Sequence, residues 1–259
     1  MPASSRLRAV LALLLFLPVV LCCFLFASHL AGVWIGAETP DRARLSLLAG
    51  HLLGLGLPCL AAAELFRLGR PELGIASVPW RSLVPAVLFV LGLWPGLLAL
   101  DSLRARWFQD AARQEDFRLL ATPGAGGLAA VFGILAVLPA LMEETVFRGI
   151  LQPLLEKAWG RGPAVVLTAA LFSAYHLNAE QVLVPLLLGL ALGWLRSSTG
   201  SLLPCMLCHA LHNGVAVLAM TYVPQWGSSW PCAAAGLLLA LVSARALGRP
   251  ALKAPPGRG

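Results

Sequence analysis

The sequence has little charge. Only 12% of its 259 residues are charged and 59% are hydrophobic, with a mean hydropathy of +0.81, whereas soluble domains carry about 25% charged residues. This small number of charged side chains cannot cover the surface of a globular protein in water. Much of the surface must therefore face lipid. The composition therefore argues against a water-soluble domain and predicts an all-α, polytopic transmembrane helix bundle.

Lysine is scarce, because Lys157 and Lys253 are the only two. The net charge of +7 comes mostly from single arginines between apolar runs, a pattern that anchors helices in membrane lipid. Such scattered charge does not favour a nucleic-acid partner. A chain rich in Leu, Ala, Gly and Arg is typical of a high-GC bacterial gene, so we expect a multi-pass protein of the bacterial inner membrane.

Cysteines are few and lie in apolar stretches, not in the loops between them. The six are Cys22, Cys23, Cys59, Cys205, Cys208 and Cys232. A secreted disulfide framework would need cysteines in exposed loops of a small domain. The pattern instead predicts small apolar packing residues.

A bilayer-spanning helix needs about 20 apolar residues, and this measure predicts eight helices. They cover residues 9–35, 45–66, 82–100, 127–158, 162–178, 180–196, 201–222 and 229–247. The first run is too long for a signal peptide. With eight spans and more Lys and Arg on the inside, both termini are predicted to be cytoplasmic.

The most polar stretch, 101–118, is predicted to be an amphipathic interfacial helix, and the basic tail from 248 to 259 to be disordered. This suggests three parts. Residues 1–125 hold the first helices and the interfacial helix, 126–222 a core of four helical segments, and 223–259 the last helix and the tail.

Three charged residues lie well inside the fourth apolar segment, away from its ends: Glu143, Glu144 and Arg148. One charge at the bilayer centre costs about 2.5–3.5 kcal/mol, so three need a reason. Glu144 and Arg148 are four residues apart and can pair on one helix face. Glu143 is turned about 100° away and is predicted to face something else.

Two further segments carry polar residues at one-turn spacing. Phe172 and His176 share a helix face, as do His209 and Asn213. Counting from the helix turns at a rise of about 1.5 Å per residue, antiparallel packing brings Glu143, His176, His209 and Asn213 to one layer. We therefore predict that they form a common site.

This set of side chains suits two kinds of chemistry. A glutamate beside a histidine can activate water as a general base, while a His and an Asn one turn apart can donate hydrogen bonds to an oxyanion. The same Glu143, His176 and His209 are also credible zinc ligands. The spacing alone does not decide between them.

The three motifs Glu-Glu-x-x-x-Arg, Phe-x-x-x-His and His-x-x-x-Asn occur in order with fitting gaps, and the stretch 198–204 precedes the last. From about residue 126 to 221 the chain resembles the CPBP (CAAX protease and bacteriocin-processing, Abi) family of intramembrane proteases, related to the type II CAAX prenyl endopeptidase. The resemblance implies an all-helical, multi-spanning glutamic endopeptidase that hydrolyses a peptide bond in a membrane-associated substrate.

The resemblance also implies roles for the residues. Glu143 would activate water with help from His176, His209 and Asn213 would form the oxyanion hole, and Glu144, Arg148 and Phe172 would support them. No cofactor is then required, although a zinc-dependent form of the protease stays open. The substrate is expected to be a protein or peptide with a membrane-associated C-terminal segment, and a non-prenylated one if the chain is bacterial.

Other functions fit parts of the sequence. Cys205 to His209 spells C-x-x-C-H, the pattern of c-type haem attachment, but it lies inside an apolar span, so we expect no haem. A transporter would explain intramembrane charges, yet no inverted repeat is visible. A non-catalytic membrane scaffold or bacteriocin-immunity protein is the remaining alternative.

Overall fold

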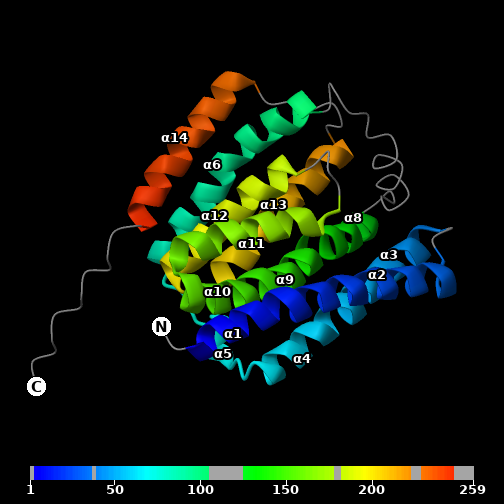
Figure 1. Cartoon of the computed structure of the whole chain (residues 1–259). Helices are drawn as coiled ribbons and strands as arrows, with labels where there is room; N and C mark the ends of the chain where they lie inside the picture. Colours follow the sequence, from blue (N-terminus) through cyan, green and yellow to red (C-terminus); the bar gives the residue numbers. More distant parts are fainter. Residues whose placement is uncertain (1–2, 37–38, 105–124, 178–181, 223–228, 248–259) are drawn as a thin grey trace, which may run out of the picture.

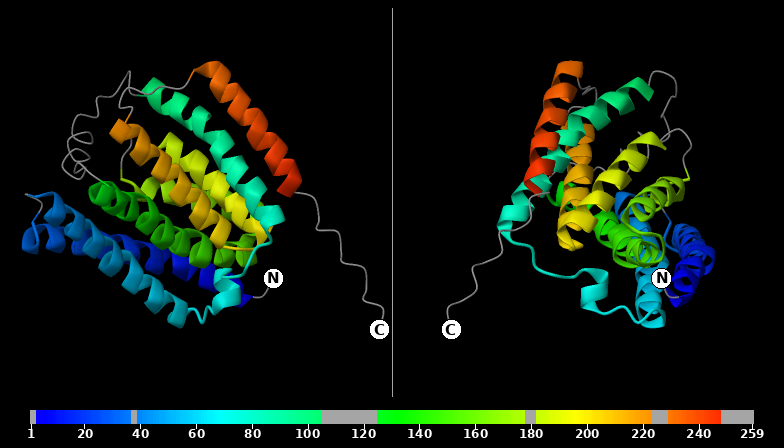
Figure 2. Two further views of the ribbon diagram at one scale, coloured as in Figure 1. Left: turned by 180° about the vertical axis from the view of Figure 1, so that it is seen from behind. Right: turned by 60° about the vertical axis from the view of Figure 1, so that its left-hand side comes forward.

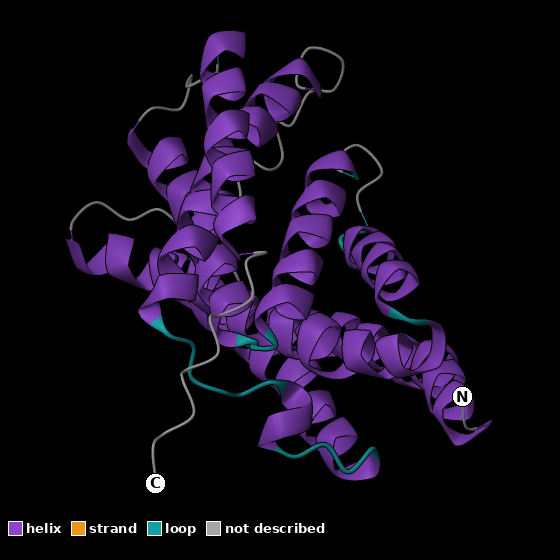
Figure 3. Ribbon diagram, turned by 90° about the vertical axis from the view of Figure 1, so that its left-hand side faces the viewer, coloured by secondary structure: helices purple, strands orange, loops and turns teal. Residues whose placement is uncertain are grey.

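The computed structural model describes residues 3–36, 39–104, 125–177, 182–222 and 229–247. Every regular element within these ranges is a helix (Figure 3), as the composition predicts. The expected interfacial helix lies almost wholly, and the expected disordered tail entirely, outside the described residues.

The described residues form eight helical rods, and four π-turns, labelled η, interrupt three of them. The first rod consists of α1 (Ala3–Leu11), η1 (Ala12–Phe16) and α2 (Leu17–Trp34). The second consists of α3 (Pro40–His51), η2 (Leu52–Gly56) and α4 (Leu57–Leu65). These two rods are the N-terminal pair. After the short α5 (Arg70–Leu73) comes α6 (Trp80–Arg104). The longest rod is α8 (Ala125–Phe132), η3 (Gly133–Val137), α9 (Leu138–Glu144), η4 (Thr145–Leu151) and α10 (Gln152–Trp159). The last four are α11 (Arg161–Tyr175), α12 (Leu183–Thr199), α13 (Leu203–Tyr222) and α14 (Trp230–Leu247).

The rod α8–α10 lies in the middle of the molecule (Figure 1). The N-terminal pair α1–α4 packs along one side of it, and α11, α12 and α13 pack on the other. Beyond them lies α6, with α14 packed along it at the outer edge (Figure 2). Segments four, five and seven of the sequence, which carry the three motifs, are therefore neighbours.

The eight predicted segments all coincide with helical rods, and these rods differ in length. Among the described residues, five helices are long and apolar enough to cross a membrane, whereas Leu183–Thr199 and Leu203–Ala219 are shorter apolar helices. Helix α11 has only 15 residues, a length of about 22 Å at 1.5 Å per residue.

The π-turns have a common cause in the sequence. Each ends two residues before a proline, and the prolines are Pro18, Pro58, Pro139 and Pro153. Proline lacks an N–H group and its ring clashes with the carbonyl of the preceding turn. Widening that turn relieves the clash, and the residue after it bonds five positions back, as Gln152 N–H does to Phe147 O. The last of these turns, η4, carries Arg148.

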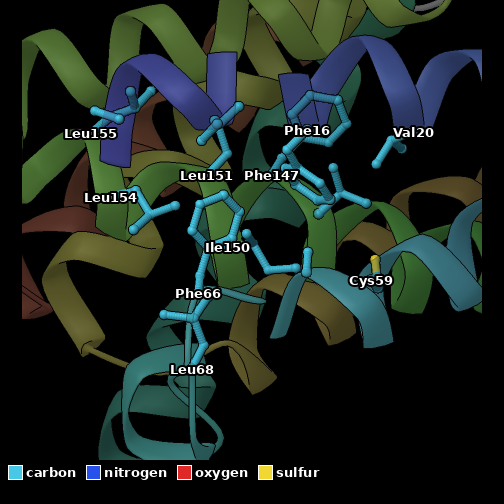
Figure 4. Close-up of a cluster of buried hydrophobic side chains, with 14 of the residues drawn as sticks. Phe16, Val20, Cys59, Phe66, Leu68, Phe147, Ile150, Leu151, Leu154 and Leu155 are labelled. Carbon is cyan, nitrogen blue, oxygen red and sulfur yellow. The ribbon is translucent and has the colours of Figure 1, made fainter. Parts of the chain in front are cut away.

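The largest cluster of buried apolar side chains joins the N-terminal pair to the central rod. Phe16 from η1 and Phe66, which follows α4, pack edge to face with ring centroids 6.1 Å apart, and both contact the cluster around Phe147 and Ile150 (Figure 4). Burial of these side chains fixes the rotation of η4 about its axis. That rotation turns the opposite face of the rod, with Glu144 and Arg148, toward α11, α12 and α13.

Candidate active site

A buried ion pair lies at the junction of α9 and η4. Arg148 Nη1 donates to Glu144 Oε1 at 2.8 Å, and both side chains are fully buried. This contact confirms the pairing predicted from their four-residue spacing. Breaking a buried pair of this kind leaves an uncompensated charge, so each residue depends on the other.

His209 of α13 joins this pair. Its Nδ1 lies 2.8 Å from Glu144 Oε1, and because a carboxylate only accepts, Nδ1 carries the proton and donates. This bond fixes the orientation of the ring. Its other nitrogen, Nε2, then faces Glu143 Oε2 at 3.9 Å, beyond hydrogen-bond length. His209 therefore stands between the two carboxylates, a contact that the sequence spacing did not reveal.

Glu143 is 7% exposed, unlike Glu144, which is not exposed at all. Within the described ranges its side chain forms no hydrogen bond, and the His209 ring approaches it at 3.9 Å. Glu144 is thus held by two partners while Glu143 retains free acceptor positions. The structure separates the two carboxylates as the helix geometry predicted.

Arg148 is held from three sides. Besides Glu144, its Nη2 donates to the carbonyl of Gly189 in α12 at 3.1 Å. Its guanidinium also lies over the Phe172 ring, 4.4 Å from the centroid, which is a favourable cation–π distance. These contacts explain why the membrane protein tolerates a buried arginine, and they tie α12 to the carboxylate pair.

Phe172 separates the two histidines of the predicted site. Its ring centroid is 4.9 Å from that of His176 and 5.7 Å from that of His209, and the ring is buried. The predicted supporting residue therefore contacts Arg148 and both histidines. A smaller side chain here would remove all three contacts at once.

His176 lies at the end of α11 and is exposed. Its Nδ1 lies 2.8 Å from the Phe172 carbonyl, and because a carbonyl only accepts, Nδ1 holds the proton and Nε2 of the neutral ring is free to accept one. The structure shows no bond between His176 and Glu143. The next residue, Leu177, adopts a positive φ of 51° and ends the helix.

Asn213 follows His209 by one turn of α13 and is partly buried. No hydrogen bond of its side chain is formed within the described ranges. It therefore shares a helix with His209, as predicted, but is not part of the bonded group Glu144, Arg148 and His209.

A zinc site would need three ligands at close range. Across the part of the chain that the structure describes, no group of three or more His, Cys, Asp or Glu side chains is arranged to hold a metal ion. Glu143, His176 and His209 thus do not fit a zinc ion in this arrangement, because His176 lies on the far side of Phe172.

A second buried polar group lies next to the site and was missed in the sequence. Gln152 Nε2 lies 2.9 Å from the Gly193 carbonyl oxygen, 2.9 Å from Glu156 Oε1 and 2.8 Å from Ser197 Oγ, so these three acceptors share its two hydrogens. Gln152 follows Arg148 by four residues and therefore lies on the same face of the rod. This spacing could have indicated from the sequence that Gln152 is buried beside the site. The bonds lock α12 onto the central rod.

The fold and the buried cluster define an all-helical membrane protein with a carboxylate–histidine centre. Residues 125–215 match the family model described as type II CAAX prenyl endopeptidase Rce1-like, nearly the stretch on which the motif resemblance rests. The match supports the resemblance of this segment to the CPBP and CAAX-protease family. Comparison with curated proteins and with solved structures gives no match.

Proposed function

We propose that this chain is an intramembrane endopeptidase in which Glu143 is the general base. The observation that carries the proposal is the difference in bonding between two adjacent buried carboxylates. Glu144 is bonded to Arg148 and His209, whereas Glu143 has free acceptor positions beside a histidine. The family match over 125–215 independently favours a peptidase.

In the proposed reaction Glu143 takes a proton from a water molecule whose oxygen attacks the carbonyl carbon of the substrate. The carbonyl oxygen becomes an oxyanion. The C–N bond then breaks as the proton passes from Glu143 to the leaving nitrogen, so that one water is consumed and two chain ends form. A buried, fixed carboxylate does this without reorganising its surroundings.

His209 and Asn213 are the proposed oxyanion donors. Because Nδ1 of His209 already donates to Glu144, only a doubly protonated ring can also donate from Nε2. Glu143 and Glu144 on either side compensate the charge of that ring. His176, with its free Nε2 near the exposed end of α11, is proposed to assist Glu143 once substrate brings the two together.

The proposed substrate is a protein or peptide with a membrane-associated C-terminal segment, cleaved in the bacterial inner membrane by a protein whose termini are both cytoplasmic. No metal, haem or nucleic acid takes part in the proposal. A non-catalytic scaffold or immunity protein is the alternative, and it predicts that loss of Glu143 changes no substrate.

The test compares membrane and secreted proteins from cells that carry the wild-type chain or Glu143→Ala. We expect a precursor to accumulate in the variant, while the variant itself stays inserted at wild-type level. Glu64→Ala is the matched control, since Glu64 is exposed on α4. Equal processing in all three strains would refute the peptidase and favour the scaffold.

A further inference from the structure

Tyr175 is a buried polar residue for which neither the motifs nor the proposed mechanism has a use. It immediately precedes His176, but successive residues of a helix point about 100° apart. His176 is exposed, whereas Tyr175 is only 9% exposed. Where the sequence suggested that His176 faces Glu143, the residue that α11 turns inward at this level is Tyr175.

The hydroxyl of Tyr175 is fully buried and forms no hydrogen bond with the described part of the chain. Leaving a buried hydroxyl without a partner costs about 1–3 kcal/mol. Phenylalanine would fill the same space without that cost. The buried hydroxyl is therefore available as a hydrogen-bond donor to a group outside the described protein.

The ring of Tyr175 packs against the turn of the central rod that follows Glu143. Its ring centroid lies 5.7 Å from that of Phe147, and Phe147 follows Glu143 by four residues, on the same face of the rod. Phe147 and Tyr175 belong to one buried cluster, part of which is drawn in Figure 4. The buried hydroxyl and the Glu143 carboxylate therefore belong to neighbouring turns of two packed helices, and no direct hydrogen bond joins them.

We propose that the Tyr175 hydroxyl is a positioning residue that donates a hydrogen bond to the water held by Glu143. This proposal rests on the proposed function, because it assigns Tyr175 to the same general base. Two fixed partners hold the water in one orientation, with one lone pair directed at the substrate carbonyl. A water held in the attacking geometry reacts faster than one held by a carboxylate alone.

The substitution Tyr175→Phe removes the oxygen atom and keeps the ring. We expect processing of the precursor found in Glu143→Ala cells to slow by about 2- to 10-fold, the worth of one hydrogen bond between neutral groups, with the unfolding temperature maintained. Tyr222→Phe is the matched control, because Tyr222 is the other tyrosine of the chain and is 66% exposed.

Infrared spectroscopy tests the contact without any substrate. In the purified full chain carrying ¹³C-labelled glutamate, the Glu143 carboxyl band is assigned with Glu143→Gln. We expect this band to shift in Tyr175→Phe and to stay in place in Tyr222→Phe. In the reverse test, we expect the C–O band of labelled Tyr175 to shift in Glu143→Gln. This measurement tests the contact even if Tyr175→Phe does not fold.

The two measurements separate the proposals. Reciprocal infrared shifts support the bridge between Tyr175 and Glu143 even if no precursor is found, and then the proposed peptidase alone fails. Unchanged bands in both directions overturn the role of Tyr175, whatever the precursor does.

Discussion

Two helix contacts in this molecule are built on opposite principles. The contact of α9 and η4 with α11 and α13 contains a buried ion pair, a histidine and a cation–π contact. The contact of α6 with α14 contains close backbone packing, because a Cβ atom at Gly92 would lie 2.6 Å from the Gly236 carbonyl oxygen. The first is specified by polar chemistry and the second by the absence of side chains.

The difference shows which part of the bundle is specialised. Lipid offers no hydrophobic force to bring helices together, so close packing of small residues is an ordinary way to hold them. Buried charges are costly there and mark function. The family match covers the polar contact and ends before α14. We therefore expect substitutions at the two contacts to separate activity from stability.

The largest effect is expected at the polar contact. Arg148→Met should destabilise the chain by about 3–5 kcal/mol, because it leaves the buried Glu144 carboxylate without its arginine counter-charge. Thermal unfolding in detergent measures this. Asp41→Asn is the control, since it breaks the Arg44 pair in which Asp41 is 93% exposed, and such pairs contribute about 0–1 kcal/mol. Similar losses for both variants would mean that the buried pair is not the stronger one.

A smaller effect is expected where backbones touch. Gly92→Ala should cost about 1–3 kcal/mol, as overpacking does, because its Cβ would meet the Gly236 carbonyl and the Ala240 nitrogen. In the same helix, Gly96→Ala should be neutral or slightly stabilising, since no atom lies within 4 Å of the added Cβ. Both variants, once folded, should process the precursor normally. Equal stability of the two would contradict the close contact of α6 and α14.

Much of the fold can be predicted from the positions and lengths of the apolar segments. All eight rods lie close to their predicted ranges, and the spacing of Glu144 and Arg148 correctly predicts their pair. Proline positions carried the signal for the π-turns, which the sequence reading did not use. Helix ends were less certain, as at α11, which ends at Tyr175 rather than near residue 178.

The rotation of each helix about its axis was not predictable from spacing. Heights along the helices put His176 level with Glu143, but tertiary packing of Phe147 and Phe172 turns Tyr175 inward and leaves His176 exposed. For the same reason the bond from His209 to Glu144 came only from the structure. The catalytic roles of Glu143, His176, His209 and Asn213 stay predictions.

The most direct measurement compares purified wild-type chain with Glu143→Gln, which removes the charge and keeps the shape, in cleavage of the accumulated precursor. Each is assayed before and after exhaustive chelation. The account predicts that Glu143→Gln lowers the rate by about 10²–10⁴-fold, the usual contribution of a general base, and that chelation changes nothing. Cleavage at an undiminished rate by Glu143→Gln, or a rate lost on chelation and restored by zinc, would contradict it.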